Sequence, residues 1–305
     1  MSSADITSVG TAVATEGANE PRVKQTYRES KKQKKSPVAT AVATIIAILW
    51  TIPTVGLLIT SFRPQIDALR SGWWMAWQEP NFTLENYEEV LDRAGLAESF
   101  VNSIVITIPA VVLPLVLASL AAYGFAWIDF RGRGSLFVGV FALQIVPLQV
   151  ALIPLLTDYV DFGMSGSYWP IWISHSIFAL PLAVYLLNNF MREIPRELIE
   201  AARVDGAGHV KIFFQVLLPL LTPAIAAFGI FQFLWVWNDL LVGLTFGSTD
   251  TRPITVIVAE LTGTRGSAWH LLSAGAFVSI ALPVLVFISL QRYFVRGLLA
   301  GGLKG

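Results

Sequence analysis

Six apolar stretches, each long enough to cross a lipid bilayer, constrain this chain more than any other feature. A helix needs about 20 residues to cross a hydrocarbon core about 30 Å thick. The stretches lie near 38–61, 99–127, 135–157, 168–190, 219–243 and 271–292. They are too long and too uniformly apolar for barrel strands, and backbone groups in lipid must be satisfied within the segment. The sequence therefore predicts an all-α integral membrane protein with six transmembrane helices.

The composition agrees with this fold class and excludes some chemistry. Apolar residues make up 54% of the chain and charged residues 14%, and the mean hydropathy is +0.63, beyond the usual range of soluble domains. Lys plus Arg and Asp plus Glu balance at 21 each, so the net charge indicates no partner. The absence of cysteine excludes disulfides, Cys-ligated metals and thiol chemistry.

The placement of Lys and Arg predicts the orientation, because short cytoplasmic flanks carry an excess of both. If the N-terminus is cytoplasmic, that side receives sixteen of them: Arg22, Lys24, Arg28, Lys31, Lys32, Lys34, Lys35, Arg131, Arg133, Arg192, Arg196, Arg203, Lys211, Arg292, Arg296 and Lys304. The other side receives five: Arg63, Arg70, Arg93, Arg252 and Arg265. We therefore expect both termini and the loop 191–218 in the cytoplasm, and the loops 63–98 and 244–270 outside.

The two ends of the chain are predicted to flank one six-span transmembrane domain, residues 37–297. Residues 1–36 are rich in Ser, Ala, Thr and Lys without periodicity, which predicts a disordered basic cytoplasmic tail. This tail either sets the topology or contacts anionic lipid through Lys31 to Lys35. The first span begins too late and is too long for a cleaved signal, so we expect it to stay as an anchor. Residues 298–305 are predicted to form a cytoplasmic C-terminal tail.

The two outer loops carry different features. In 63–98, Thr83 is placed to cap a short helix that turns Leu84, Tyr87 and Leu91 to one side. In 244–270, Gly, Thr and charged residues surround a β-prone PITVIV run. The length of this loop is unusual for a simple connection, which predicts contact with another molecule.

The stretch EAARVDGAGHVKIFFQVLLPLLTP, residues 200–223, predicts a helical hairpin between two spans. Pro195 suits the first turn of a helix, and Asp205-Gly206 supplies a stop and a turn. A second helix is expected over about 208–217. The carboxylates of Glu200 and Asp205 are placed to pair with basic groups on a partner. From these residues alone, a solvated connecting loop explains the stretch equally well.

The pattern E-A-A-x-x-D-G-A (200–207), followed by L-P-L-x-x-P, resembles the signature loop of the membrane subunits of binding-protein-dependent ABC importers. Five further stretches resemble the carbohydrate-type branch of that family, and within it the maltose-permease G-like subunits: NFTLENY, FVNSIVIT, WNDLL (237–241), PITVIVAEL and the ending QRYFVRGLLAGGLKG. The likeness extends from about residue 40 to the end of the chain.

The resemblance implies three contact regions and their partners. The hairpin would be the coupling helix that docks in a cleft of a cytoplasmic ATPase, with Glu200 meeting a basic residue there and Gly206 forming the turn. The coupling residues would be Glu200, Ala201, Ala202, Asp205, Gly206 and Ala207. The tail would reach into the ATPase dimer through Ala300, Gly301, Gly302 and Lys304, although a frayed terminus is the alternative. The outer loop would contact the sugar-binding protein through Arg252, Pro253, Thr255, Glu260 and Gly263.

The chain itself is predicted not to be an enzyme. It contains no G-x-x-x-x-G-K-[ST] sequence, and His175, His209 and His270 show no ligand spacing. We expect no catalytic residue, no metal and no cofactor in this chain, with ATP and Mg²⁺ on the partner ATPase. The implied partners are an ABC ATPase dimer, a second homologous permease subunit, an extracytoplasmic sugar-binding protein and membrane lipid, and no nucleic acid. The expected location is the prokaryotic cytoplasmic membrane.

The polar residues of the spans are mostly neutral, which suits a sugar better than an ion relay. They are Gln144, Gln149, Asn188, Asn189, Gln232 and Asn238, with His175 and Asp239 as the ionisable exceptions. Gln232, Trp235, Trp237 and Asn238 are candidate cavity residues, although an interfacial aromatic belt also explains the tryptophans. Every span contains proline, which bends helices and opens cavities: Pro53, Pro109, Pro114, Pro147, Pro154, Pro181, Pro223 and Pro283.

The sequence therefore predicts a permease subunit of an ATP-driven importer for a di- or oligosaccharide, which couples ATPase closure to alternating access. Two alternatives remain open at this point. The same machinery could carry a polyol, a glycerophosphodiester or a phosphorylated glycerol. A carrier driven by an ion gradient, working alone, is the alternative from a different class.

Overall fold

The computed structural model describes residues 36–261 and 268–302. The predicted basic tail, Gly263 and Lys304 therefore lie outside the described residues. The chain divides into two units, residues 1–53 and 54–305. The described part of the first unit is the beginning of α2 (Pro37–Ser61), an apolar helix that contains Pro53. All further elements belong to the second unit.

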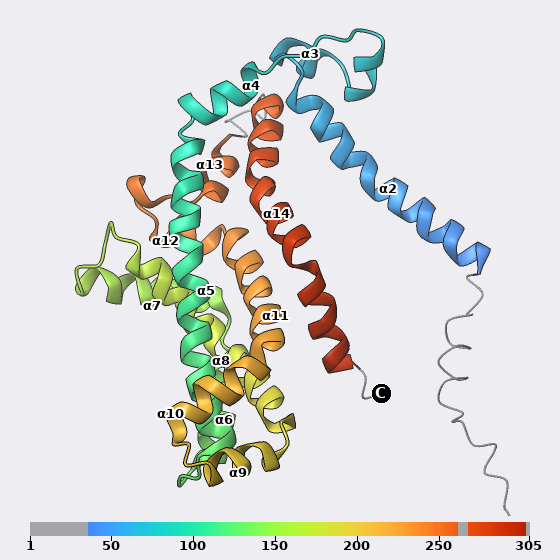
Figure 1. The fold of residues 1–305 in the computed structure, drawn as a ribbon. Helices are drawn as coiled ribbons and strands as arrows, with labels where there is room; N and C mark the ends of the chain where they lie inside the picture. The colour runs from blue at the N-terminus through green and yellow to red at the C-terminus, as the bar shows by residue number, and fades with distance from the viewer. Residues whose placement is uncertain (1–35, 262–267, 303–305) are drawn as a thin grey trace, which may run out of the picture. The chain divides into compact units, whose positions relative to one another are not determined.

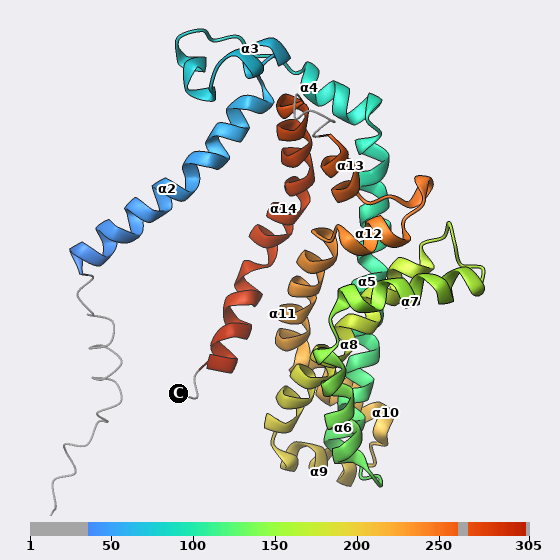
Figure 2. The same ribbon diagram turned by 180° about the vertical axis from the view of Figure 1, so that it is seen from behind.

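The second unit is helical throughout its described residues (Figures 1 and 2). Its long helices are α5 (Leu96–Trp127), α8 (Trp169–Glu193), α11 (Leu218–Trp237) and α14 (Trp269–Gly302). In the described part of the chain, five helices are long and apolar enough to cross a membrane, and a bent helix pair could supply a sixth crossing. These findings confirm the predicted all-α membrane fold with up to six spans.

The third predicted span, 135–157, is not one continuous helix. It consists of α6 (Arg133–Ala142), the 3₁₀ turn η3 (Leu143–Ile145) and α7 (Leu148–Asp161), and the chain bends by 98° between the two parts. The bend occurs at Val146 and Pro147, which both have extended backbone angles. Proline lacks an N–H group and disfavours helical angles in the residue before it. The expected proline bend is thus present, but it divides this stretch into two helices.

Helices α5 and α8 form the most extensive helix pair of the bundle. Small buried residues allow the two backbones to approach, among them Ala118 and Ala122 on α5 and Ala183 on α8. Side chains of α8 also bond to the backbone of α5 near both ends of the pair. Trp172 Nε1 donates to the Val105 carbonyl at 3.1 Å, and Asn188 Nδ2 donates to the Ala122 carbonyl at 3.3 Å. The two helices therefore run in the same direction through the bundle.

The segment after α2 contains α3 (Gln65–Arg70), the 3₁₀ helix η1 (Trp73–Trp77), α4 (Glu85–Glu88) and the π-helical turn η2 (Glu89–Arg93). The predicted cap is wrong in its position, because Leu84 is the N-cap of α4 and no side chain caps this helix. Thr83 Oγ1 instead accepts the Glu85 N–H at 3.1 Å from one residue before the cap. The predicted apolar face is wrong at Leu84, which is exposed. Asn86 is buried instead, since its amide donates to the carbonyls of Ser61 and Arg63 at 2.8 and 2.9 Å.

The remaining predictions about elements concern the fifth and sixth spans. The second limb of the hairpin is not a separate helix: α10 (His209–Lys211) and the π-helical turn η4 (Ile212–Leu217) continue directly into α11. The β-prone PITVIV run forms a helix, α13 (Ile254–Glu260), after α12 (Leu241–Phe246) and the turn η5 (Thr249–Thr251). Helix α14 extends to Gly302, through the first part of the predicted tail.

Candidate functional site

The hairpin of residues 194–211 lies at the C-terminal end of α5, and α12 and α13 lie toward the N-terminal part of α5 (Figure 1). Its first limb is α9 (Arg196–Val204), which follows Pro195. The turn has the predicted form: Gly206 has a φ of +78°, its N–H bonds to the Arg203 carbonyl at 3.0 Å, and the Ala207 N–H bonds to the Ala202 carbonyl at 2.9 Å. Glycine adopts such a left-handed angle without steric cost.

The exposed and buried faces of the hairpin are clearly separated. Glu200, Ala201, Asp205 and Gly206 are exposed, and Val204 is 88% exposed. Two of the six predicted coupling residues, Ala202 and Ala207, are half-buried and pack against the core. The arrangement leaves a compact surface with small residues, the carboxylates of Glu200 and Asp205, and the exposed Val204 and Val210, which a partner of complementary shape could cover.

Apolar contacts and one hydrogen bond join the hairpin to the bundle. Ile199 on α9 and Ile212 on η4 are buried in the same apolar cluster as the end of α5. Tyr123, itself buried on α5, forms a 2.6 Å hydrogen bond between its hydroxyl and His209 Nδ1. These contacts fix both limbs of the hairpin against one helix of the bundle.

Glu200 also lines a shallow polar hollow of about 160 Å³ between the hairpin and the turn after α5. Arg196 and Arg203 of α9 line the same hollow, together with Arg133 and Asp129, whose ion pair measures 2.8 Å. The carboxylate of Glu200 therefore lies among cationic side chains of its own chain. A basic group of a partner would have to reach it from the exposed side of α9.

The segment of residues 238–260, on the other side of the bundle, is held by polar side chains. Asn102 on α5 donates to the carbonyls of Asp250 and Arg252 at 3.0 and 3.3 Å and accepts the Tyr168 hydroxyl at 2.7 Å. Ser103 Oγ accepts the Ile254 N–H at 2.7 Å. Asparagine and serine at these two positions of α5 thus bond backbone groups of η5, of Arg252 and of the first residue of α13.

Of the described residues predicted to contact the binding protein, two have exposed charges, and the other two are buried or hydrogen-bonded within the segment. Arg252 and Glu260 have partly exposed side chains, 39% and 54%, and form an ion pair at 3.3 Å. Pro253 is buried, and the hydroxyl of Thr255 donates to the Asp239 carbonyl at 2.5 Å. Among the described members of the predicted set, Arg252 and Glu260 are therefore the ones that present charge to the surroundings.

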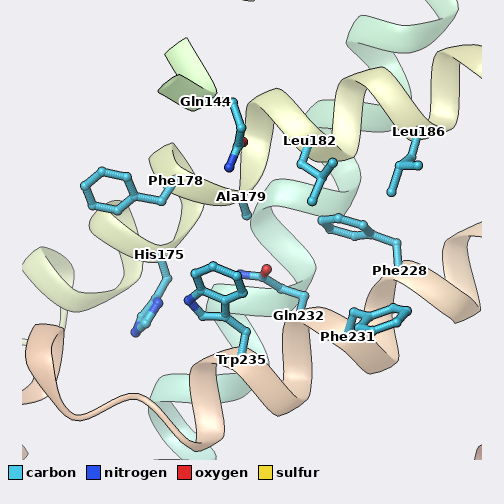
Figure 3. A pocket seen from close by; sticks show the side chains of 10 residues that line it. All are labelled: Gln144, His175, Phe178, Ala179, Leu182, Leu186, Phe228, Phe231, Gln232 and Trp235. Carbon is cyan, nitrogen blue, oxygen red and sulfur yellow. The ribbon is translucent and has the colours of Figure 1, made fainter. Parts of the chain in front are cut away.

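A pocket of about 240 Å³ lies between α8, α11 and the break after α6 (Figure 3). Gln232 and Trp235, two of the predicted cavity residues, line it from α11. Gln144 lines it from η3 and His175 from α8, and the remaining wall is apolar: Phe178, Ala179, Leu182, Leu186, Phe228 and Phe231. Figure 3 shows the amide of Gln144 pointing into the pocket from the wall facing Gln232 and Trp235.

Two predicted cavity residues lie elsewhere. Asn238 is exposed at the end of α11, where its amide donates to the Leu234 carbonyl at 2.8 Å. Trp237 is buried, and its indole N–H donates to the Ser279 carbonyl at 3.0 Å. The sequence did not assign Gln144 or His175 to the pocket. The sequence signal that could have identified Gln144 was its position three residues before Pro147. Where a proline interrupts a helix, the side chains beside the break can line a cavity.

No group of three or more His, Cys, Asp and Glu side chains that could hold a metal ion occurs in residues 36–261 and 268–302. The candidate sites are the exposed face of the hairpin, the exposed face of the segment 238–260 and the pocket beside Gln232.

The sequence profile described as "Binding-protein-dependent transport system inner membrane component" matches residues 99–299, more than half of the chain. The chain belongs to this family. The match confirms the predicted relation to ABC importer permeases and the multi-pass location in the inner membrane. Within such a system the permease is the membrane-spanning component, and it is neither the catalytic subunit nor a carrier of a cofactor.

Curated relatives of this permease transport different solutes. The osmoprotective compounds uptake permease protein GgtD of Synechocystis is 50% identical over 265 residues, which cover 85% of this chain and 89% of GgtD. The alpha-glucoside transport system permease protein AglG of Rhizobium meliloti is 49% identical over 240 residues, 76% of this chain and 63% of AglG. The melibiose/raffinose/stachyose import permease protein MelC of Bacillus subtilis is 34% identical over 262 residues, 85% of this chain and 94% of MelC.

A solved structure supports the fold of the permease independently. A chain of a bacterial ABC transporter involved in the import of the acidic polysaccharide alginate matches with a TM-score of 0.69 at 19% sequence identity. The match covers 91% of this chain and 100% of that chain. At this level of identity the comparison concerns the fold alone.

Proposed function

We propose that the permease is one of two homologous membrane subunits of an ATP-driven importer for a sugar. The observation that carries this proposal is the exposed hairpin, where Glu200 and Asp205 flank small residues around the left-handed turn at Gly206. A compact, rigid projection with small residues and carboxylates can enter a cleft on another protein. Family membership favours this interpretation over the solvated loop and over the ion-driven carrier.

The distribution of cations supports a cytoplasmic position for the hairpin and for both termini. The side that carries the hairpin also receives sixteen of the Lys and Arg residues, against five on the other side. A cytoplasmic hairpin would face the compartment in which ATP is available. The end of the chain, with Ala300, Gly301, Gly302 and Lys304, would provide a second contact with the ATPase dimer.

In the proposed mechanism, the hairpin passes the motion of the ATPase pair to the bundle. Glu200 would pair with a basic residue of the ATPase, while Ala201 allows the two backbones to approach closely. Ile199, Ile212 and the Tyr123–His209 hydrogen bond join the hairpin to α5. When the ATPase dimer closes on ATP, a hairpin held in this way would move together with α5, and alternating access would follow.

The segment of residues 238–260 would face the extracytoplasmic sugar-binding protein. Arg252 and Glu260 offer an exposed pair of opposite charges, and rim charges of this kind steer association more than they add affinity. The polar bonds from Asn102 and Ser103 would keep this surface in a fixed position on α5 while the binding protein docks.

The solute class is supported by the relatives and by the neutral pocket. Relatives are named for alpha-glucosides, for melibiose, raffinose and stachyose, and for osmoprotective compounds. A di- or oligosaccharide fits the first two names. A polyol or a glycerol-phosphate-type solute is the second candidate, because the name of the relative with 50% identity specifies osmoprotection and no sugar.

Purification in mild detergent from the native host, followed by mass spectrometry, tests the assembly. We expect the permease to retain an ABC ATPase and a second permease subunit, and vesicles containing the complex to accumulate a sugar only with ATP and the binding protein. A permease that purifies alone and still transports without ATP would contradict the proposal. Uptake of a phosphorylated glycerol in place of sugars would leave the machinery in place and correct the cargo.

A further inference from the structure

The break between α6 and α7 exposes irregular backbone within a stretch that is otherwise long and apolar enough to cross a membrane. Phe141 to Pro147 are all exposed in the described structure, and Ile145 is 82% exposed. The last carbonyls of one helix and the first N–H groups of the next lack partners within their helices. At membrane depth such backbone is tolerated only where protein covers it or where it lines a water-filled cavity. In the proposed importer, this side of the bundle would therefore face protein or a water-filled cavity.

The pocket opens beside this break and continues into a second hollow. The pocket measures about 240 Å³ and the adjoining hollow about 480 Å³, and both are lined by Gln144, Phe178 and Trp235. Ligand pockets are typically about 300–1,000 Å³ in volume. The larger hollow alone falls within this range, so the space suits a solute of the size of a disaccharide.

The polar groups of the pocket are few and come from separate elements. Gln232 is only 6% exposed, and its Nε2 donates to the Ala110 carbonyl at 3.2 Å, which fixes the orientation of its amide. With the nitrogen used in this way, the amide oxygen remains available to accept a hydrogen bond from a ligand. Gln144 brings a second amide from the opposite wall (Figure 3). Two amides on facing walls can bond hydroxyl groups on both sides of one solute.

Trp235 supplies a flat apolar surface at the same place. Its side chain is 59% exposed although it lies next to the buried Gln232. An exposed indole beside two amides is suited to a solute with one face of C–H groups and a rim of hydroxyls, because the ring packs against the face while the amides bond the rim. A purely apolar ligand would leave the amide oxygen of Gln232 without a hydrogen bond from the ligand.

We propose that this permease contains its own recognition site for a neutral, polyhydroxylated solute, formed by the ring of Trp235 and the amides of Gln144 and Gln232. The site rests on the proposed importer function and adds to it, since it assigns solute contact to this subunit. His175, which is 3% exposed and lies 3.9 Å from a carboxylate oxygen of Asp239, closes one side of the pocket.

The charge of the lining selects the solute class. Among the described residues that line the pocket and the adjoining hollow, none is Asp, Glu, Lys or Arg. The aromatic rings could attract a quaternary ammonium group. The carboxylate of a zwitterion such as glycine betaine, however, would find no cationic partner, and an unpaired buried charge is costly. A neutral sugar or polyol therefore fits the pocket better than a charged osmolyte.

Transport by the complete complex, reconstituted in liposomes with its ATPase, second permease subunit and binding protein, tests the site. The probes are radiolabelled trehalose, sucrose and maltose, with glycine betaine as the zwitterionic comparison. We expect Trp235→Ala to lower the rate of sugar uptake at saturating binding protein by about tenfold, Gln144→Leu to lower it by a smaller factor, and Trp235→Phe to retain most of it. ATP hydrolysis stimulated by the binding protein should stay near the wild-type rate, because the hairpin and the segment 238–260 are unchanged.

The control is Trp77→Ala, which removes a tryptophan that is 80% exposed and lies outside the pocket. It should transport at the wild-type rate. If the wild-type complex imports sugar with ATP while Trp235→Ala and Gln144→Leu match it for every probe, the site is refuted and the importer stands. If glycine betaine uptake depends on Trp235 and sugar uptake does not, the neutral class is refuted. A wild-type complex without ATP-driven uptake would overturn the importer, and the site with it.

Discussion

The hairpin of residues 194–211 and the segment of residues 238–260 both bury apolar side chains against α5, but their hydrogen bonds to α5 differ. The hairpin is held mainly by apolar burial, through Ile199 and Ile212, with the Tyr123–His209 hydrogen bond beside them. The segment 238–260 also buries apolar side chains in clusters shared with α5, among them Val242, Phe246 and Ile254. In addition, side chains of α5 bond directly to its backbone, from Asn102 to two carbonyls and from Ser103 to one N–H.

This difference indicates how each surface can meet a partner. Apolar anchors keep the hairpin in place while its carboxylates and small residues remain free to contact another protein. Backbone hydrogen bonds instead fix the conformation of the segment 238–260 and leave the Arg252–Glu260 pair as its exposed charge. The following substitutions test the two kinds of attachment, beginning with the largest expected effect.

Glu200→Lys should have the largest effect, because it places a second cation where the proposed contact needs a carboxylate. Truncating one partner of a buried charge pair costs about 2–5 kcal/mol, and reversing the charge should cost at least as much. We expect loss of the ATPase during purification of the complex, with the bundle still folded. Glu197→Lys, an equal change in the first turn of α9, is the control and should retain the ATPase. Normal assembly and transport by Glu200→Lys would refute the coupling role.

Gly206→Pro should disrupt the hairpin nearly as strongly. Proline fixes φ near −65°, whereas Gly206 has a φ of +78° and uses its N–H in the turn. We expect disulfide crosslinking between engineered cysteines in the hairpin and the ATPase to fall sharply. Gly206→Ala should cost about 1–2 kcal/mol through its φ alone, since nothing lies within 4 Å of an added Cβ.

Gly208→Ala is the matched control for this turn. Gly208 has a φ of −75°, and an added Cβ again has no neighbour within 4 Å. The same added methyl group should therefore leave crosslinking unchanged. Equal loss in Gly206→Ala and Gly208→Ala would show that the left-handed turn is not what shapes the contact.

Asn102→Ala should loosen the other attachment. It removes the donor to the carbonyls of Asp250 and Arg252, and an unsatisfied buried polar group costs about 1–3 kcal/mol. We expect a lower unfolding temperature and faster hydrogen exchange in residues 248–256, with the hairpin unaffected. Asn81→Ala removes an exposed hydrogen bond to Asp67 and should change the stability by less than about 0.5 kcal/mol. Wild-type exchange in Asn102→Ala would mean that apolar packing holds this segment without the hydrogen bonds of Asn102.

Tyr123→Phe should produce a smaller effect at the hairpin. It deletes the hydroxyl that bonds His209 and keeps the ring that packs against Phe213 at 5.5 Å. One hydrogen bond contributes about 1 kcal/mol, which corresponds to about a fivefold rise in ATP hydrolysed per solute imported if the bond transmits motion. Tyr185→Phe, which keeps its stacking on Phe141, is the control. An unchanged ratio of ATP to solute would limit the Tyr123 hydroxyl to a structural role.

Arg252→Ala should have the smallest effect on stability, below about 1 kcal/mol, because exposed ion pairs contribute little. Its effect on the association rate of the binding protein should be larger and should depend on salt. The double change Arg252→Glu with Glu260→Arg restores an ion pair but reverses its direction. We expect this double variant to regain stability and not the association rate. Recovery of both would show that the binding protein does not recognise these charges.

Sequence reasoning predicted the spans and the hairpin more accurately than the path of the chain within them. Hydropathy sums the free energy of transfer of a stretch into lipid and does not report the direction of the backbone. The sequence therefore predicts one span over 135–157, although Pro147 divides it into two helices. Local propensity also misled at PITVIV, because β-propensity depends strongly on context. There the helix α13 buries Ile254 and Val256 and places its first N–H on Ser103.

The pocket was predicted only in part for a similar physical reason. A polar residue within a span is expected to form a hydrogen bond, but the sequence does not show which direction its side chain faces. Gln232 and Trp235 face the pocket, whereas Asn238, one helical turn from Leu234, bonds to the carbonyl of that residue. Gln144 belongs to the pocket because the chain turns beside it, and the direction of that turn depends on tertiary packing.

The two attachments on α5 also have a mechanical consequence. Asn102 and Tyr123 lie about 30 Å apart along an axis that rises 1.5 Å per residue, and Pro109 and Pro114 occur between them. Each proline removes one backbone hydrogen bond of the helix. Helix α5 therefore bends most easily near its middle and less easily where it contacts the hairpin and the segment 238–260. A helix that bends near Pro109 and Pro114 allows its two halves to tilt by different amounts. In the proposed importer, where the two sides must not be open at once, such a helix would link the movements of the hairpin and of the segment 238–260 without coupling them rigidly.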